Sequence, residues 1–105
     1  MTAAEFVKGL PAKAPKESLE GLDTTIQFKF SGEGGGDYVA TARDGELVVT
    51  EGEAADAEVT VRSEGETFMK LVRKEINPMM AMMTGKVKID NVGAMMKYAK
   101  LFGMM

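Results

Sequence analysis

The sequence contains no cysteine, no histidine and no tryptophan. Without cysteine the chain can form neither a disulfide nor a thiolate nucleophile. Without histidine it lacks the most frequent general base, the most frequent metal ligand and the side chain that usually switches charge near neutral pH. An enzyme would have to work with carboxylates, lysines and hydroxyls alone, so we expect no catalytic residue, no metal site and no cofactor.

Long apolar runs and basic clusters are also missing. No apolar segment reaches the roughly 18 residues that span a membrane, and the N-terminal residues lack the apolar stretch of a secretory signal. The formal net charge is −3 and there is no basic run, which argues against nucleic acid as a partner. The 105 residues suffice for one domain over residues 1–105, and without cysteine the redox compartment stays open at this point.

Five segments alternate apolar and polar residues, which is typical of half-buried strands. Ile26, Gln27 and Phe28 begin this alternation in the first segment, which predicts that Gln27 lies on the polar face. Asp44-Gly45 separates the second and third segments and is a strong signal for a two-residue hairpin. The five predicted strands are residues 24–30, 38–43, 46–52, 57–62 and 86–90.

Helices are predicted between and around these strands from capping residues and helical spacing. Thr2 and Glu5 have the spacing of a capping box, and so do Ser63 and Glu66. Asn77 precedes a proline, as a helix cap often does. The predicted helices cover residues 3–9, 63–76, 77–84 and 91–102, with at most one turn at 16–20. Strands and helices together indicate an α+β fold.

Methionine is concentrated at one end of the chain. Nine of the ten methionines lie between Met69 and Met105. Because methionine is flexible and specifies packing poorly, a rigid core would gain more from leucine or isoleucine. The clustering favours a deformable cavity or interface, with plain core filling as the alternative. In the predicted last helix only Lys97 and Lys100 form a polar strip, so the core and a ligand, a partner or a membrane should cover it together.

The C-terminal third carries the most specific pattern in the sequence. Asn77-Pro78 is followed by an apolar helix, Gly85-Lys86, a lysine-rich strand with Lys88 and Ile89, and an apolar last helix with Met96-Lys97. In this order of features the sequence resembles the sterol carrier protein 2 domain in its short, free-standing microbial form, over about residues 19–103. It departs from the family pattern at Arg73, where a glycine is usual, and at Asp90-Asn91, where a glycine often comes first.

The resemblance implies a mixed five-stranded sheet with helices packed on it, enclosing an apolar tunnel that binds lipids. It further implies non-catalytic carriage of fatty acyl chains, acyl-CoA, phospholipids or sterols, so our first hypothesis is a cytoplasmic lipid carrier. We expect the wall of this lipid-binding cavity to come from the apolar faces of the last three helices. The predicted wall residues are Phe68, Leu71, Val72, Met79, Met80, Met82, Met83, Met95, Met96, Ala99 and Phe102.

Two other uses of the methionine-rich end stay open. The last helix could serve a protein–protein interaction or dimerisation module, and the sequence leaves the oligomeric state undetermined. Transient membrane contact could coexist with lipid carriage, with Lys97 and Lys100 at the head groups and Phe102, Met104 and Met105 inserted. Residues 101–105 are expected either to close one end of the tunnel or to belong to the core.

Overall fold

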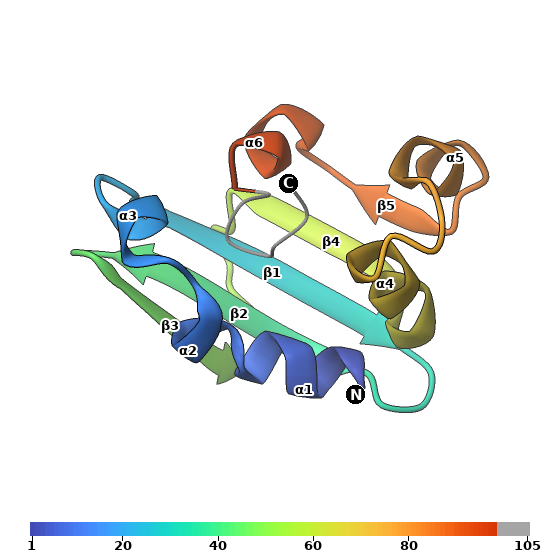
Figure 1. The fold of residues 1–105 in the computed structure, drawn as a ribbon, viewed down its shortest axis with the longest axis horizontal. Helices are drawn as coiled ribbons and strands as arrows, with labels where there is room; N and C mark the ends of the chain where they lie inside the picture. Colours follow the sequence, from blue (N-terminus) through green and yellow to red (C-terminus); the bar gives the residue numbers. More distant parts are fainter. Residues whose placement is uncertain (99–105) are drawn as a thin grey trace.

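The computed structural model describes residues 1–98, apart from the side chain of Ser18, and its centre is a mixed five-stranded sheet (Figure 1). The strand order is β3-β2-β1-β4-β5. Only β1 and β4 pair in parallel, and the other neighbours are antiparallel. The strands are β1 (Thr24–Ser31), β2 (Gly36–Arg43), β3 (Glu46–Glu51), β4 (Val59–Glu64) and β5 (Val87–Ile89). The predicted α+β class and the five-stranded mixed sheet are thus confirmed.

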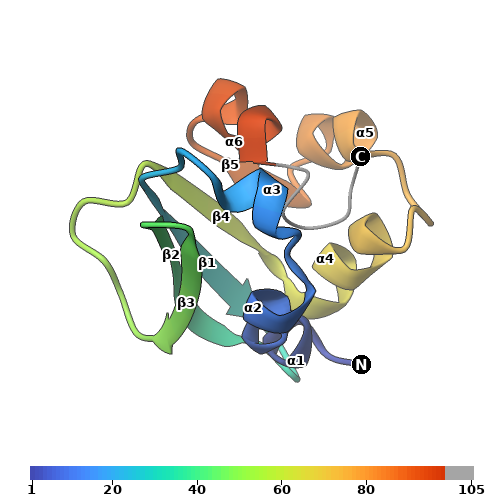
Figure 2. The same cartoon turned by 60° about the vertical axis from the view of Figure 1, so that its left-hand side comes forward.

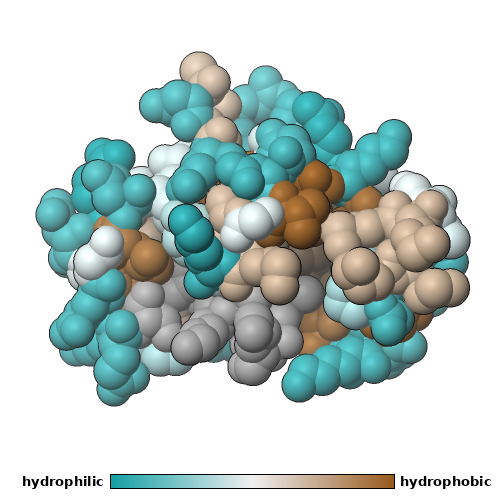
Figure 3. All heavy atoms as spheres, turned by 90° about the horizontal axis from the view of Figure 1, so that it is seen from above, coloured by the Kyte–Doolittle hydropathy of each residue, from teal (hydrophilic) through white to brown (hydrophobic). Residues whose placement is uncertain are grey.

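All helices of the described part lie on one face of the sheet, and the connection from β3 to β4 crosses the other face (Figure 2). The N-terminal helices α1 (Ala3–Lys8), α2 (Leu10–Lys13) and α3 (Lys16–Leu19) pack near β2 and β3. The later helices α4 (Gly65–Val72), α5 (Pro78–Met83) and α6 (Val92–Tyr98) pack near β4 and β5. Seen from the side of α5 and α6, apolar side chains reach the surface over these helices (Figure 3).

The core lies between the sheet and the helices, where the predicted alternation places it. Phe28 and Phe30 of β1 are buried on the helix side. Their rings meet Phe68 of α4, with centroid distances of 5.9 and 4.8 Å, and Phe6 of α1 approaches Phe68 at 5.9 Å. This aromatic cluster joins the first and fourth helices to the central strand, so it fixes where α4 sits.

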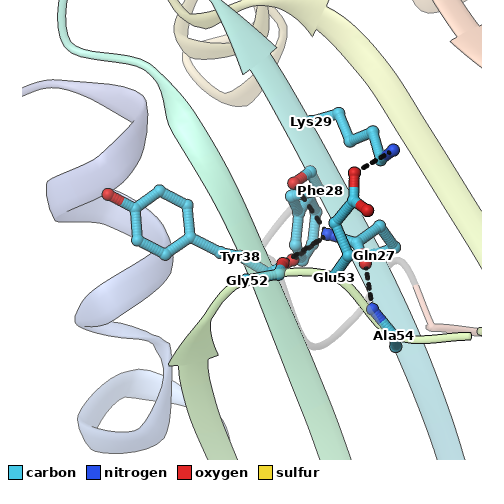
Figure 4. Close-up of polar contacts among 7 residues, drawn as sticks. All are labelled: Gln27, Phe28, Lys29, Tyr38, Gly52, Glu53 and Ala54. Carbon is cyan, nitrogen blue, oxygen red and sulfur yellow. Dashed lines mark hydrogen bonds and ion pairs between the residues drawn. The ribbon is translucent and has the colours of Figure 1, made fainter.

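Gln27 is buried on the opposite face of the sheet, although the alternation predicted an exposed position. Its Nε2 donates hydrogen bonds to the carbonyl oxygens of Tyr38 and Gly52, each at 3.0 Å, and its Oε1 accepts one from the amide of Ala54 at 2.6 Å (Figure 4). The connection between β3 and β4 therefore covers Gln27. These two strands run in the same direction, so the chain has to cross the sheet between them.

Local turn signals in the sequence were mostly correct. Asp44 and Gly45 adopt φ values of 56° and 77°, as a two-residue hairpin turn requires. Thr2 and Glu5 form the predicted capping box. The four-residue helix α2 was not predicted, because its proline at the second position suggested an irregular segment.

The second predicted capping box was wrong. Ser63 belongs to β4, where it pairs with Phe30 and Val87, and its hydroxyl donates to the carbonyl oxygen of Glu64. The helix α4 begins only at Gly65, and no side chain caps it. Pairing with two neighbouring strands holds Ser63 extended, so the local capping signal is overridden.

The helix predicted over residues 63–76 ends at Val72. Lys74 has a φ of 62°, and the amides of Lys74 and Glu75 donate to the carbonyl oxygens of Leu71 and Lys70. This hydrogen-bond pattern is a Schellman motif, which ends a helix with a left-handed residue. The chain after Lys74 consequently leaves the helix axis and runs toward α5.

Candidate functional site

An apolar cavity of about 640 Å³ lies between the β4–β5 edge of the sheet and the helices α4, α5 and α6. Its size falls within the range of about 300–1,000 Å³ that is usual for small-molecule sites. The described residues that line it are Val61, Phe68, Leu71, Lys74, Glu75, Ile76, Asn77, Pro78, Met82, Val87, Ile89, Val92, Met95 and Met96. We refer to this space as the apolar cavity.

Strand alternation and helix periodicity explain why these side chains converge. Val87 and Ile89 are two residues apart in β5, so both face the helices. Phe68 and Leu71 are three residues apart in α4 and share one helix face. Met82 of α5 reaches the cavity from a third direction. The result is a space enclosed by branched side chains of the sheet and by flexible methionines of the helices.

The polar groups at the cavity belong to the connection between α4 and α5. Asn77 is occupied as the cap of α5, where its Oδ1 accepts the amide of Met79 at 2.8 Å. Glu75 forms an ion pair with Arg73. Lys74 also lines the cavity, and within the described part of the chain it has no ion-pair partner. Lys74 thus supplies a positive charge beside an otherwise apolar space.

The helix α6 is anchored at both ends of its described length. Asn91 caps its start, because Asn91 Oδ1 accepts the amide of Ala94 at 3.2 Å. At its end the hydroxyl of Tyr98 donates to Oε1 of Glu58 at 2.8 Å, and the hydroxyl of Thr24 donates to the same oxygen. The hydrogen bonds from Thr24 and Tyr98 hold the pKa of the Glu58 carboxyl below its usual value.

The structure brings part of the predicted wall together. Five of the eleven predicted residues line the cavity, namely Phe68, Leu71, Met82, Met95 and Met96. Val72 is partly buried and packs against the core away from the cavity. Ala99 and Phe102 lie outside the described residues, as does the proposed closing segment 101–105.

Three methionines of α5 are placed on the outside of the molecule. Met79, Met80 and Met83 are 64%, 59% and 79% exposed. Only Ala81 of α5 is fully buried, and Pro78 and Met82 line the cavity, so the inward stripe of this short helix passes through positions 78, 81 and 82. Helical geometry then directs positions 79, 80 and 83 outward. Methionine content alone could not distinguish the two faces.

Sequence reasoning missed the contribution of the sheet and of the α4–α5 connection. Val87 and Ile89 were predicted to face inward, which was the available signal that they adjoin the helices. Ile76 was assigned to a helix face, and Lys74 to its exposed side. Both reach the cavity because α4 ends early.

Metal clusters and membrane-spanning helices are both absent from the described residues. Within residues 1–98 no group of three or more histidine, cysteine, aspartate or glutamate side chains is arranged to hold a metal ion. Among the helices that the structure describes, none has the length and apolar character to cross a membrane.

Comparison with known proteins gives one family. A sequence model of the SCP-2 sterol transfer family matches residues 5–103. Hydroxysteroid dehydrogenase-like protein 2 of Xenopus tropicalis is 29% identical over 103 residues, which make up 96% of this chain and 25% of the relative. The chain therefore spans about a quarter of the length of this curated relative.

Solved structures share the fold. The sec-alkylsulfatase Pisa1 from Pseudomonas sp. matches with a TM-score of 0.79 and 25% identity, over 100% of this chain and 16% of the sulfatase chain. The solution structure of palmitated SCP2L2 from Aedes aegypti matches with a TM-score of 0.68 and 17% identity, over 95% of both chains. The same arrangement thus occurs as a small part of a large enzyme and nearly alone.

Proposed function

The chain belongs to the SCP-2 sterol transfer family, and we propose that it binds lipids in the apolar cavity and carries them through the cytoplasm without changing them. The observation that carries this proposal is the cavity of about 640 Å³ between sheet edge and helices. Its lining is apolar except at the α4–α5 connection. A ligand with an apolar body and one polar end fits such a space.

The energetics of an acyl chain support binding of moderate strength. Each buried CH₂ group contributes about 0.8 kcal/mol, so a chain of about sixteen carbons gains on the order of 12 kcal/mol. Lost translational and conformational freedom offsets about 4 to 15 kcal/mol of this gain. We expect affinities near the micromolar range, where the net free energy is about −8 kcal/mol.

The ligand class that we favour is the fatty acyl chain with an anionic end. Lys74 has no ion-pair partner among the described residues and lines the cavity, so it can meet a carboxylate. The related mosquito protein is described as palmitated, which agrees with this class. Because Met82, Met95 and Met96 are flexible, acyl-CoA, phospholipid and sterol-like ligands are further candidates.

Carriage is favoured over catalysis by the chemistry of the lining. The titratable side chains among the described lining residues are Lys74 and Glu75, and Glu75 is paired with Arg73. No general base adjoins a nucleophile there, as covalent catalysis would require. The dehydrogenase activity that the frog relative's name indicates concerns a protein about four times as long.

A second candidate is self-association through α6. Val92 and Met96 of this helix are 41% and 65% exposed, and both are apolar. An interface between two copies would cover them, and the molecular mass would then rise with protein concentration. Sedimentation at several concentrations, with and without added lipid, separates this role from lipid carriage.

The experiment for lipid binding uses two adjacent methionines of α5. Met82→Glu places a charge in the apolar cavity and should reduce uptake of a fluorescent fatty acid by at least about tenfold, because burying an unpaired charge is costly. Met83→Glu makes the same change at an exposed position and should leave uptake unchanged. Equal uptake by a folded Met82→Glu variant would contradict the proposal.

Native mass spectrometry of gently purified protein identifies the natural ligand. A bound lipid should appear as an added mass on the wild-type chain and on Met83→Glu. The same mass should be absent from Met82→Glu. Binding of all lipid classes equally well by both variants would place the ligand elsewhere on the molecule.

A further inference from the structure

A second hollow of about 580 Å³ lies at the outer face of the sheet, behind the β5 edge. Four cations line it, namely Lys29, Arg62, Lys86 and Lys88, together with the carboxylates of Asp37 and Glu64. We call this space the basic hollow. Its excess of positive charge is local, because the whole chain carries a net charge of −3.

Strand register explains how the cations meet. Lys29 of β1 is the register partner of Arg62 in β4, and Arg62 is the partner of Lys88 in β5. Their neighbours Phe28, Val61 and Val87 are buried on the helix side, so the three cations share the outer face. Lys86 stands two residues before Lys88 at the end of the α5–β5 turn. Three strands thus place three positive charges side by side.

Such a row is unfavourable for the free protein. Like charges directly opposite one another across strands destabilise a sheet. Lys29 is compensated by Glu53 at 2.7 Å (Figure 4) and by its register partner Asp37. Arg62, Lys86 and Lys88 form no ion pair with any carboxylate of the described residues. The charge of Glu53 also acts on Arg62, and Asp37 and Glu64 line the hollow, so an anionic ligand would offset the repulsion that these carboxylates leave.

We propose that the basic hollow binds a phosphate group. A planar guanidinium such as that of Arg62 can donate two parallel hydrogen bonds to a phosphate, and lysine ammonium groups add positive charge around it. The hydroxyls of Ser63 and Thr84 already donate to the carbonyl oxygens of Glu64 and Met80, so the cations supply the contacts to the phosphate. An extended nucleic acid fits less well, because the basic residues are confined to one end of the sheet in an acidic chain.

The hollow and the apolar cavity lie on opposite faces of the same short strand. Val87 and Ile89 of β5 line the apolar cavity, whereas Lys86 and Lys88 line the basic hollow. The two spaces are separate, so a soluble compound can supply the phosphate. They also adjoin the same strand at the edge of the sheet, so the head group of a lipid can supply it as well. The phosphate site does not depend on the proposed lipid carriage, because different side chains form the two spaces.

The first test titrates inorganic pyrophosphate into the wild-type protein at low ionic strength and follows backbone amide signals by NMR. The signals of Arg62, Ser63 and Lys88 should shift with saturation at millimolar ligand or below. The double variant Arg62→Gln/Lys88→Gln should bind at least about tenfold more weakly. A matched control, Lys13→Gln/Lys16→Gln, removes two charges outside the hollow and should bind as the wild type does. Absence of shifts, or equal weakening in the control, would overturn the proposal.

A second arm identifies the source of the phosphate. Vesicles of phosphatidylglycerol and of phosphatidylcholine are sedimented with each variant. If the double variant loses binding to phosphatidylglycerol vesicles as well as to pyrophosphate, the hollow takes a lipid head group. If only pyrophosphate binding falls, the ligand is a soluble phosphate compound. Fatty acid uptake should be unchanged in both variants, so a failure here is distinguishable from a failure of lipid carriage.

Thermal melts separate ligand binding from a structural role. Without ligand at low salt, the double variant should melt about 1 to 5 °C above the wild type, because it relieves like-charge repulsion. The difference should shrink as salt is added. A lower melting temperature of the ligand-free double variant would mean that Arg62 and Lys88 support the fold, and would overturn the argument from repulsion.

Discussion

The hydroxyl of Tyr98 in α6 donates a hydrogen bond of 2.8 Å to Oε1 of Glu58, just before β4. Forty residues of sequence separate the two side chains. The contact ties the methionine-bearing helix to the sheet beside the central strand, because Thr24 of β1 donates to the same carboxylate oxygen. The contact thus holds α6, which forms one wall of the apolar cavity, although neither Glu58 nor Tyr98 lines the cavity.

This contact predicts a pH dependence of stability. The hydrogen bonds from Thr24 and Tyr98 lower the pKa of Glu58 in the folded protein from its ordinary value of 4.5. A carboxyl with a lowered folded pKa stabilises the protein above the unfolded value and loses this contribution as the pH falls through the folded value. Tyr98→Phe should therefore lower the melting temperature at pH 7 by about 2 to 6 °C.

The difference between Tyr98→Phe and the wild type should shrink progressively below pH 4.5, as Glu58 becomes protonated. Thermal melts of both proteins from pH 7 to pH 3 check this. Tyr38→Phe is the control, because the Tyr38 hydroxyl forms no hydrogen bond with a carboxylate in the described part of the chain. A difference independent of pH would assign Tyr98 to packing alone.

Lys74→Gly should stabilise the protein. Lys74 holds a φ of 62° at the end of α4, a conformation that costs a residue with a side chain about 1 kcal/mol more than glycine. We expect the free energy of unfolding to rise by about 1 kcal/mol. The same substitution should weaken fatty acid uptake if the Lys74 ammonium meets the carboxylate of the ligand. Chemical denaturation and a fluorescent fatty acid titration measure the two effects.

The chain offers a matched control at the end of α5. Gly85 has a φ of 76°, and the amides of Gly85 and Lys86 complete the same hydrogen-bond pattern there. A Cβ at Gly85 would meet no atom within 4 Å, so Gly85→Ala tests the backbone conformation without a steric clash. It should destabilise by about 1 kcal/mol. The free energy of unfolding should rise in Lys74→Gly and fall in Gly85→Ala. A change in the same direction in both variants would refute the argument.

Gln27→Leu should destabilise the protein by about 2 to 4 kcal/mol. The substitution keeps the approximate volume but removes the partner of the Gly52 carbonyl and of the Ala54 amide. Each buried polar group left without a partner costs about 1 to 3 kcal/mol. Hydrogen exchange at Ala54 should accelerate more than at the centre of β2, which distinguishes release of the crossover from general unfolding. Thr25→Val, on the same strand face, should cost less than about 1 kcal/mol.

The sequence by itself determined most of the elements and several of their ends. Period-two alternation identified the five strands, because each has one face on the core. Asp44-Gly45 and the caps Thr2 and Asn77 were readable, since these residues satisfy local backbone groups wherever the fold places them. The apolar face of α4 was readable for the same local reason. Such signals depend on neighbours within about four residues in the chain.

Only the tertiary structure decided what lies next to what. The parallel pairing of β1 with β4 sends a crossover over Gln27, which turns an apparently exposed polar residue into a buried anchor. The same pairing aligns Lys29 with Arg62, although 33 positions separate them in the sequence. Which methionines face the apolar cavity depends on how α5, between the two turns at Lys74 and Gly85, is laid against β5. Helical periodicity defines a stripe on α5, but packing against the sheet selects the side on which that stripe lies.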